Sequence, residues 1–191
     1  MEIDGAALRH NVGEIRQRLA KGVQIIASVK ANAYGHGIVP VARILAGAGV
    51  EMLATGSYGE ARKLRRAGID TPVLLLAGAL PAAMAEILAQ GFIPTVYDLD
   101  GARAVSRAAT APAPVFVKVD CGLGRIGVAP GEALALLEGI AGLANVQVQG
   151  LYTHLSFQDG DGMAYAKARL ALFYDLVKSL RAAGFDIPVT Q

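Results

Sequence analysis

Short apolar runs alternate with longer amphipathic segments along the whole chain. Apolar residues at helical spacing predict a helix over residues 6–20, with Leu8, Val12, Ile15 and Leu19 on one stripe. Further helices are predicted over residues 38–48, 57–67, 81–90, 98–109, 131–142 and 162–183. Strands are predicted for the runs VQIIASV, VEMLAT, PVLLLA, IPTVY, PVFVKVD, VQVQGLYTHL and IPVTQ, which begin at residues 23, 50, 72, 93, 114, 146 and 187. The repeated strand–helix order predicts an α/β protein with a parallel sheet.

Two parallel-sheet architectures fit this order of elements. A doubly wound open sheet is complete with five or six strands, whereas a (β/α)8 barrel needs eight strands and typically about 250 residues. The chain has 191 residues and shows no linker, low-complexity tract or internal repeat. A single domain is therefore expected, and length alone slightly favours the open sheet.

Composition and charge exclude several classes of protein. Hydrophobic residues make up 53% of the chain and charged residues 18%, which is typical of a protein with a large core and not of a disordered one. The formal net charge of +2 gives no support for binding to nucleic acid or to an anionic membrane surface. The uncharged run at residues 71–85 contains two prolines and is shorter than the roughly 18 apolar residues of a membrane span. The N-terminus is not that of a signal peptide, and a single cysteine forms no intrachain disulfide, so a soluble cytoplasmic protein is expected.

One lysine stands out, because Lys30 follows the first predicted strand in the stretch SVKANAYGHG. Active sites of barrels and of open α/β sheets lie at the C-terminal ends of the strands. A lysine held there can form a Schiff base with a carbonyl group, although a solvated surface position is the commoner fate of a lysine. Tyr34 follows four residues later, so a turn that begins at Lys30 would bring both side chains to one side.

A glycine-rich stretch, GLGRIG at residues 122–127, fits the G-x-G-x-x-G pattern of dinucleotide-binding proteins. Its surroundings argue against that function. Lys118 and Asp120 lie in the preceding strand, and Pro130 intervenes before the next helix. No second strand ends in a clear ribose-binding acid about 20 residues later. A nicotinamide site is therefore not expected here.

The stretch VKANAYGHG resembles the pyridoxal-phosphate attachment motif of the alanine racemases, and the match is unbroken over nine residues. EIDGAALRHN near the N-terminus, KVDCGLGRIG at residues 118–127 and YTHL near His154 resemble further blocks of the same family, in the same order. The resemblance implies a TIM-type (β/α)8 barrel, and so decides between the two architectures. Residues 1–191 would form about six to seven of its eight units, without the β-rich domain that follows the barrel in this family.

The resemblance also implies roles for residues of the first block. Lys30 would hold pyridoxal 5'-phosphate through a Schiff base and act as one of two opposed catalytic bases. Tyr34 would bind the cofactor phosphate. His10 and His36 are taken as structural residues.

Further roles follow for residues near the later strands. Lys118 would be the lysine that is often carbamylated in this family, and its negative charge would orient Arg125. Arg125 would lie near the cofactor's phenolic oxygen and the substrate carboxylate, which suits a planar guanidinium fork. His154 would lie against the cofactor ring. Without the resemblance, Lys118 and Arg125 form an ordinary strand-end pair with Asp120, and His154 is a core histidine. Cys121 is expected to be a packed thiol, since no basic partner other than Lys118 or Arg125 can be named for it.

The implied function is the pyridoxal-phosphate-dependent interconversion of L-alanine and D-alanine, which supplies D-alanine for bacterial peptidoglycan. Alanine as the small-molecule substrate, a homodimer and the absence of a metal are expected with it. The family's pyridine-nitrogen arginine, Asn-Ser phosphate segment and tyrosine base lie beyond the position that matches Gln191, so residues 1–191 are expected to be an N-terminal part without activity of its own.

Two alternatives stay open. The first is a non-catalytic pyridoxal-phosphate-binding protein of the related single-barrel type, which serves cofactor homeostasis. The second is a racemase for serine, lysine or a broad set of amino acids. The second is kept because Ser156 and the run FQDGDG at residues 157–162 depart from the pattern expected after Thr153 and His154.

Overall fold

A computed structural model describes residues 2–157 and 162–191 of the chain, which forms two compact units. The first unit comprises residues 1–79 and 89–93, and the second comprises residues 80–88 and 94–191. Residues 158–161, at the centre of the run that departs from the family pattern, lie outside the described residues.

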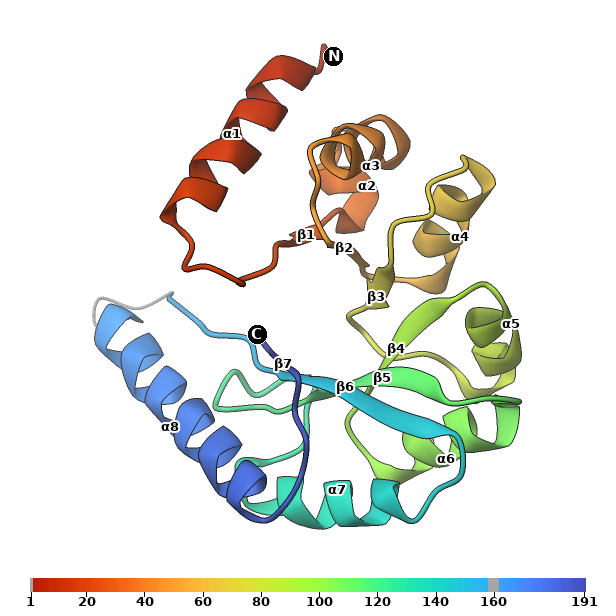
Figure 1. Ribbon diagram of the computed structural model, residues 1–191, viewed down its shortest axis with the longest axis vertical. Helices are drawn as coiled ribbons and strands as arrows, with labels where there is room; N and C mark the ends of the chain where they lie inside the picture. Colours follow the sequence, from red (N-terminus) through yellow and green to blue (C-terminus); the bar gives the residue numbers. More distant parts are fainter. Residues whose placement is uncertain (1, 158–161) are drawn as a thin grey trace. The chain divides into compact units, whose positions relative to one another are not determined.

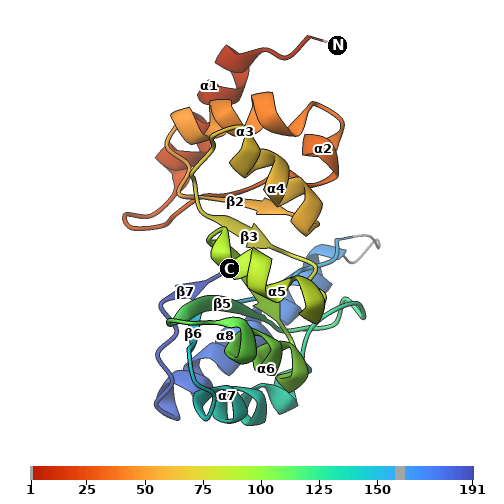
Figure 2. The same cartoon turned by 90° about the vertical axis from the view of Figure 1, so that its right-hand side faces the viewer.

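The first unit is built from three strands and the helices that connect them. Its elements are α1 (Gly5–Arg18), β1 (Ile26–Ser28), α2 (Lys30–Tyr34), α3 (Ile38–Gly47), β2 (Met52–Thr55), α4 (Tyr58–Arg66) and β3 (Val73–Leu75). The strands pair in parallel and in sequence order, with Ile26 opposite Met52 and Leu53 opposite Val73. Helix α3 packs between α1 and α4, and α4 also contacts β2 and β3 (Figure 2). Every residue of β2 and β3 is buried, so these strands form the centre of this unit's core.

The remaining elements repeat the same strand–helix order. They are η1 (Pro81–Ala83), α5 (Met84–Ala89), β4 (Phe92–Val96), α6 (Leu99–Ala108), β5 (Ala113–Lys118), η2 (Pro130–Glu132), α7 (Ala133–Ala141), β6 (Val146–Tyr152), α8 (Gly162–Ala182) and β7 (Val189–Thr190). In the second unit the strand pairs are again parallel and sequential, with Thr95 opposite Phe116, Ala113 opposite Val146 and Gly150 opposite Val189. Helices α6, α7 and α8 lie along one face of these strands (Figure 1).

The ends of the helices are set by short-range signals in the sequence. The side chain of Ser57 accepts the Glu60 N–H group at the start of α4, and that of Asp98 accepts the Gly101 N–H group at the start of α6. Gly68 has a φ of 71°, a left-handed conformation that glycine adopts without steric cost, and it follows the end of α4. These signals explain why the predicted helix boundaries agree with the structure to within a few residues.

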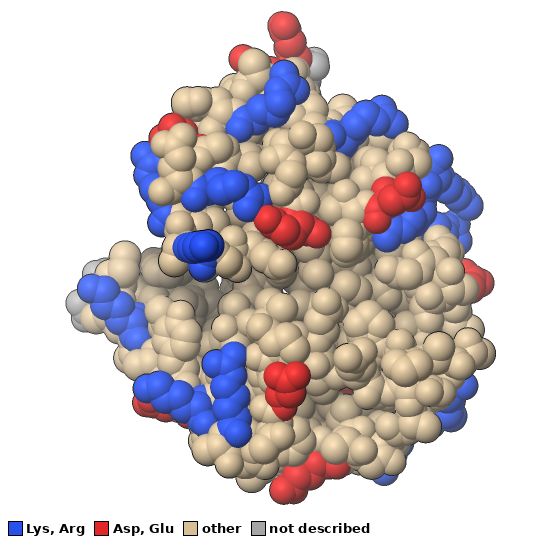
Figure 3. All heavy atoms as spheres, viewed as in Figure 1, with Lys and Arg blue, Asp and Glu red and all other residues tan. Residues whose placement is uncertain are grey.

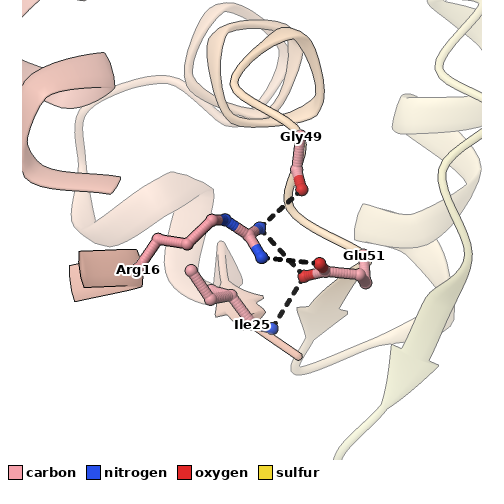
Figure 4. Close-up of polar contacts among 4 residues, drawn as sticks. All are labelled: Arg16, Ile25, Gly49 and Glu51. Carbon is pink, nitrogen blue, oxygen red and sulfur yellow. Dashed lines mark hydrogen bonds and ion pairs between the residues drawn. The ribbon is translucent and has the colours of Figure 1, made fainter. Parts of the chain in front are cut away.

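An ion pair between Arg16 and Glu51 connects helix α1 to the start of the sheet (Figure 4). Both terminal nitrogens of the Arg16 guanidinium donate to the Glu51 carboxylate, at 2.8 and 3.1 Å, and one of them also donates to the Gly49 carbonyl oxygen at 2.7 Å. The Ile25 N–H group donates to the same carboxylate at 2.8 Å. The hydrogen bonds from Arg16 and Ile25 lower the pKa of Glu51 from 4.5 to about 2. This ion pair therefore lies where β1 and β2 begin, at the end of the strands away from Lys30.

Strand order distinguishes the two architectures that both fit the predicted order of strands and helices. A doubly wound sheet reverses its strand order at a switch point, whereas a barrel adds each new strand beside the preceding one. Within each unit the pairing is sequential, as a barrel requires. Two details of the sequence-based prediction are wrong. Strand β1 begins at Ile26 and not at Val23, whose side chain is 47% exposed, and Ile15 on the predicted apolar stripe of α1 is 50% exposed.

The charged side chains are spread over the surface. On the face that Figure 3 presents, Lys and Arg side chains are interspersed with Asp and Glu, and they leave wide neutral areas between them. Such a distribution lacks the continuous basic stripe with which proteins track a phosphate backbone. Across residues 2–157 and 162–191, none of the helices has the length and apolar character needed to cross a bilayer.

Candidate active site

The first group of site residues lies directly after β1. Val29 is fully buried, and Lys30 follows it at the C-terminal end of the strand, as the sequence predicted. The Cβ of Lys30 packs against the backbone of Gly56, where a Cβ added to the glycine would lie 3.5 Å from it. The Lys30 amine lies 6.0 Å from the centroid of the Tyr34 ring, so the two side chains share one side of the segment. Lys30 is half-buried and Tyr34 is 60% exposed, so both can reach a bound molecule.

The turn that brings them together is left-handed. Ala31, Asn32, Ala33 and Tyr34 all have positive φ angles, between 52° and 56°. The helical spacing rule used for Lys30 and Tyr34 assumes a right-handed turn, so the predicted proximity is confirmed but its geometric reason is wrong. Two polar contacts connect the turn to its neighbours in the sequence. The Tyr34 and Ser28 hydroxyls lie 3.4 Å apart, and Nδ1 of His36 lies 2.9 Å from the Ala33 carbonyl oxygen.

A cavity of about 400 Å³ opens beside this turn within the first unit. Its lining includes Ser28, Tyr34 and His36 together with residues at the start of α1. The hydroxyl groups at its edge therefore face space that a small molecule can enter.

A second group of site residues lies at the ends of β5 and β6 in the second unit. Lys118 is the last residue of β5 and is only 4% exposed. Its amine lies 5.6 Å from the centroid of the Tyr152 ring, and the Tyr152 hydroxyl lies 3.0 Å from that of Thr95. Burial raises the pKa of the Tyr152 phenol to about 12, so it remains protonated near neutral pH. Lysine is rarely buried to this degree unless its charge is compensated.

Asp120 organises the loop that carries Arg125. Oδ1 of Asp120 accepts the backbone N–H groups of Gly122, Leu123 and Gly124, and Oδ2 accepts that of Arg125 at 2.7 Å. Burial opposes ionisation of this carboxylate, but the four N–H groups outweigh it and lower the pKa of Asp120. The side chain of Arg125 is exposed. Asp120 therefore serves the loop backbone, since its two oxygens accept four backbone N–H groups.

Helix α8 braces the same loop from the other side. The Tyr165 hydroxyl donates to the Gly122 carbonyl oxygen at 2.6 Å, and the Arg169 guanidinium carbon lies 4.8 Å from the centroid of the Tyr165 ring. Gly122 has a φ of 127°, which strains any residue with a side chain, and a Cβ added there would lie 2.5 Å from the Tyr165 hydroxyl and would displace it. The glycines of GLGRIG thus permit a tight loop around a carboxylate.

His154 and Cys121 complete the residues singled out from the sequence. His154 follows β6 by two residues and is exposed, so it is not a core histidine. Cys121 is 2% exposed, and burial raises the pKa of its thiol, which agrees with the expected packed thiol. Lys30 and Tyr34 are thus grouped in the first unit, and Lys118, Arg125 and His154 in the second.

Sequence reasoning missed Glu60. Its carboxylate accepts the Asn32 N–H group at 2.9 Å through Oε1 and the Gly56 N–H group at 3.1 Å through Oε2. The available signal was Ser57–Tyr58–Gly59–Glu60, the S-x-x-E pattern of a capping box at the start of a helix. That pattern predicts the helix start but not the contact with Asn32.

Comparison with known proteins identifies the family. The family described as alanine racemase, N-terminal domain, matches residues 3–191. The alanine racemase of Syntrophobacter fumaroxidans is 38% identical over 190 residues, which cover 98% of this chain and 51% of that protein. That of Desulforamulus reducens is 38% identical over 187 residues, which cover 96% of this chain and 50% of that protein. The chain thus spans about half the length of the curated relatives it matches.

Solved structures agree with the sequence match. Alanine racemase from Clostridium difficile aligns with a TM-score of 0.91 and 30% identity, over 96% of this chain and 52% of its own. The enzyme from Streptomyces coelicolor aligns with a TM-score of 0.87 and 33% identity, over 99% of this chain and 52% of its own. The predicted α/β fold of the alanine racemase N-terminal type is therefore confirmed. The chain belongs to the alanine racemase N-terminal domain family.

Proposed function

We propose that the protein catalyses the pyridoxal-phosphate-dependent interconversion of L-alanine and D-alanine, and that residues 1–191 form part of its cofactor-binding barrel domain. The relatives and the aligned structures are named alanine racemases, which supports alanine as the substrate. The observation that carries the proposal is the placement of Lys30 at the C-terminal end of β1, with its amine near the Tyr34 ring.

The side chains around Lys30 fit a phosphorylated aldehyde. A half-buried primary amine is the group that combines with an aldehyde carbon, and hydroxyl groups are suitable donors to phosphate oxygens. The Lys30 amine and the Tyr34 and Ser28 hydroxyls supply both kinds of group within one segment, and Tyr34 and Ser28 also line the cavity beside the turn. We therefore infer that Lys30 holds pyridoxal phosphate and that Tyr34 binds its phosphate.

When bound, pyridoxal phosphate draws electrons from the α-carbon of an amino acid and makes its α-hydrogen acidic. In the proposed reaction, the Lys30 amine removes or returns a proton at that carbon from one face. The Arg125 guanidinium binds the substrate carboxylate, for which its planar fork is suited. His154 would contact the cofactor ring, as the family resemblance implies. Lys118 carries a carbamate whose negative charge orients Arg125, as the family resemblance implies.

Inversion of the α-carbon requires a proton donor on the opposite face. The family resemblance assigns that donor to a tyrosine beyond the position that matches Gln191. The arginine and the Asn-Ser segment that complete the cofactor site in this family lie beyond that position as well. We further propose that the protein works as a homodimer in the cytoplasm and supplies D-alanine for peptidoglycan.

Reductive trapping tests this proposal directly. The protein is incubated with pyridoxal phosphate, reduced with borohydride and digested, and the pyridoxyl group is expected on the peptide that contains Lys30. Lys30→Ala should carry no label and should exchange the α-hydrogen of alanine with solvent deuterium at least about a hundredfold more slowly. Lys63→Ala removes an exposed lysine of α4 and serves as the matched control. Label on a different lysine would refute the assignment.

A further inference from the structure

The left-handed turn after Lys30 needs support from outside itself. Residues other than glycine pay a steric cost in this conformation, of the order of 1–2 kcal/mol each, because Cβ approaches the following carbonyl oxygen. Ala31, Ala33 and Tyr34 offer no side-chain hydrogen bond to their own backbone, and asparagine at position 32 is the only residue of the four that tolerates such angles well. A run of this kind persists only where the surroundings hold it.

Glu60 provides that support from the next strand–helix unit. It lies in the first turn of α4, and its two carboxylate oxygens accept different backbone donors: Asn32 N–H at 2.9 Å and Gly56 N–H at 3.1 Å. In an ordinary capping box the glutamate returns to the N–H group of its own N-cap residue. Here it joins the loop after β1 to the loop after β2.

Asn32 holds the other side of the turn. Its side-chain oxygen accepts the Ile38 N–H group at 2.9 Å, and its carbonyl oxygen accepts the Gly37 N–H group at 2.9 Å. The backbone N–H group and both oxygens of Asn32 are therefore engaged, and Glu60 links Asn32 to Gly56 in the loop after β2. Because Lys30 precedes this turn and Tyr34 is its last residue, the handedness of the turn determines where both side chains point.

We propose that Glu60 is a positioning residue for the cofactor site: it holds residues 31–34 in the left-handed form and so directs Lys30 and Tyr34 toward pyridoxal phosphate. The cofactor part of this inference rests on the proposed function. Both carboxylate oxygens are committed to backbone donors, so Glu60 acts through Asn32 and not on the substrate.

Glu60→Gln separates this role from an ordinary helix cap. Glutamine serves as well as glutamate in a capping box, so α4 should keep its stability. However, its amide offers one acceptor oxygen where the carboxylate offers two, so one of the two backbone N–H groups loses its partner. Ser57→Ala is the reverse variant, because it removes the cap of α4 and leaves both oxygens of Glu60 in place. Glu138→Gln makes the same charge change on the exposed side of α7 and is the neutral control.

Three measurements are made on each variant. Hydrogen exchange of peptides that cover residues 30–37 and 52–59 reports on the turn without cofactor, spectroscopic titration gives the dissociation constant for pyridoxal phosphate, and thermal unfolding reports on overall stability. For Glu60→Gln we expect exchange about tenfold faster in at least one of these peptides and binding about tenfold weaker, the size of one lost hydrogen bond, with little change in unfolding temperature. For Ser57→Ala we expect a lower unfolding temperature and a dissociation constant within about twofold of wild type.

Unchanged exchange in Glu60→Gln would overturn the inference, as would faster exchange with unchanged cofactor binding. Equal weakening of binding by Ser57→Ala would also overturn it, because helix stability would then be the cause. If the wild-type protein binds no pyridoxal phosphate, the proposed function fails and the cofactor role of Glu60 fails with it. The exchange data would in that case still decide whether Glu60 holds the turn.

Discussion

The carboxylate of Asp120 accepts the backbone N–H group of Arg125 at 2.7 Å, five residues along the chain. The same carboxylate accepts three further N–H groups from residues 122–124. The loop of residues 121–125 is thereby wrapped around one negative charge. The position of Arg125 depends on Asp120, which need not touch any substrate.

Asp120→Asn should destabilise the protein and displace Arg125. Asparagine keeps one acceptor oxygen and turns an amide group toward backbone donors, so at least one N–H group in the loop loses its partner, at a cost of about 0.5–1.5 kcal/mol. Urea unfolding measures the loss. Asp100→Asn is the control, because the Asp100 side chain is 90% exposed and its ion pair with Arg103 should contribute little. A free energy of unfolding unchanged in Asp120→Asn would contradict the assigned role.

Stability should fall in acid through Glu51. The pKa of Glu51 is lowered to about 2 in the folded protein, chiefly by the Arg16 hydrogen bond, from an ordinary value of 4.5. Its contribution is therefore fully present above about pH 4.5 and is lost as the pH falls toward 2. Since the two side chains are 31% and 40% exposed, we expect about 1 kcal/mol and not the full shift. Urea unfolding between pH 2 and 6 gives the free energy of unfolding at each pH. This free energy should depend less steeply on pH in Glu51→Gln than in the wild type, whereas Glu14→Gln, in an exposed pair with Arg18, should keep the wild-type pH dependence.

Ala31 should tolerate glycine better than any branched residue. It is exposed and has a φ of 52°, so Ala31→Gly removes a steric cost without removing packing, and we expect a gain of up to about 1 kcal/mol. Ala31→Val should cost more than about 1 kcal/mol. The same substitution in a right-handed helix, Ala168→Gly at an exposed interior position of α8, should instead destabilise by about 1 kcal/mol. Thermal or urea unfolding gives the change in stability of the three variants. If both glycine variants were destabilised alike, the turn at Ala31 would have to be right-handed.

Lys118 and Arg125 should act as a functional pair in the cofactor-loaded protein. If Lys118 carries a carbamate, Lys118→Ala should lower the racemisation rate, and added acetate should restore part of it by replacing the lost negative charge. Arg125→Lys should lower the rate at least about tenfold, because a point charge replaces a bidentate fork. Arg107→Lys, at an exposed position of α6, should leave the rate unchanged. Wild-type kinetics in Arg125→Lys, or a rate for Lys118→Ala that acetate does not alter, would count against the pair.

Much of the fold could be predicted from local signals. Side-chain caps at Ser57 and Asp98 and a left-handed glycine at Gly68 place the helix ends, and sequential β/α units follow from the alternating pattern. The placement of Lys30 directly after the first strand was also correct, whereas the fifth strand ends at Lys118 and not at Asp120. The left-handed run was not predicted, because Ala31 and Ala33 carry no signal for positive φ. Its stabilising partner Glu60 lies 28 residues from Asn32, beyond the reach of any local pattern.

The hydrogen bond between Asn32 and Glu60 also sets an order of events during synthesis. A ribosome completes β1 and the segment after it before it reaches Gly56 and Glu60, since the chain grows from its N-terminus. Until the second strand and the start of α4 are folded, the Glu60 carboxylate is not in place to hold residues 31–34 in their left-handed form. A nascent chain therefore presents the Lys30 amine before the contact between Asn32 and Glu60 can form. If Lys30 binds the cofactor as proposed, cofactor loading would follow the folding of the first two strand–helix segments.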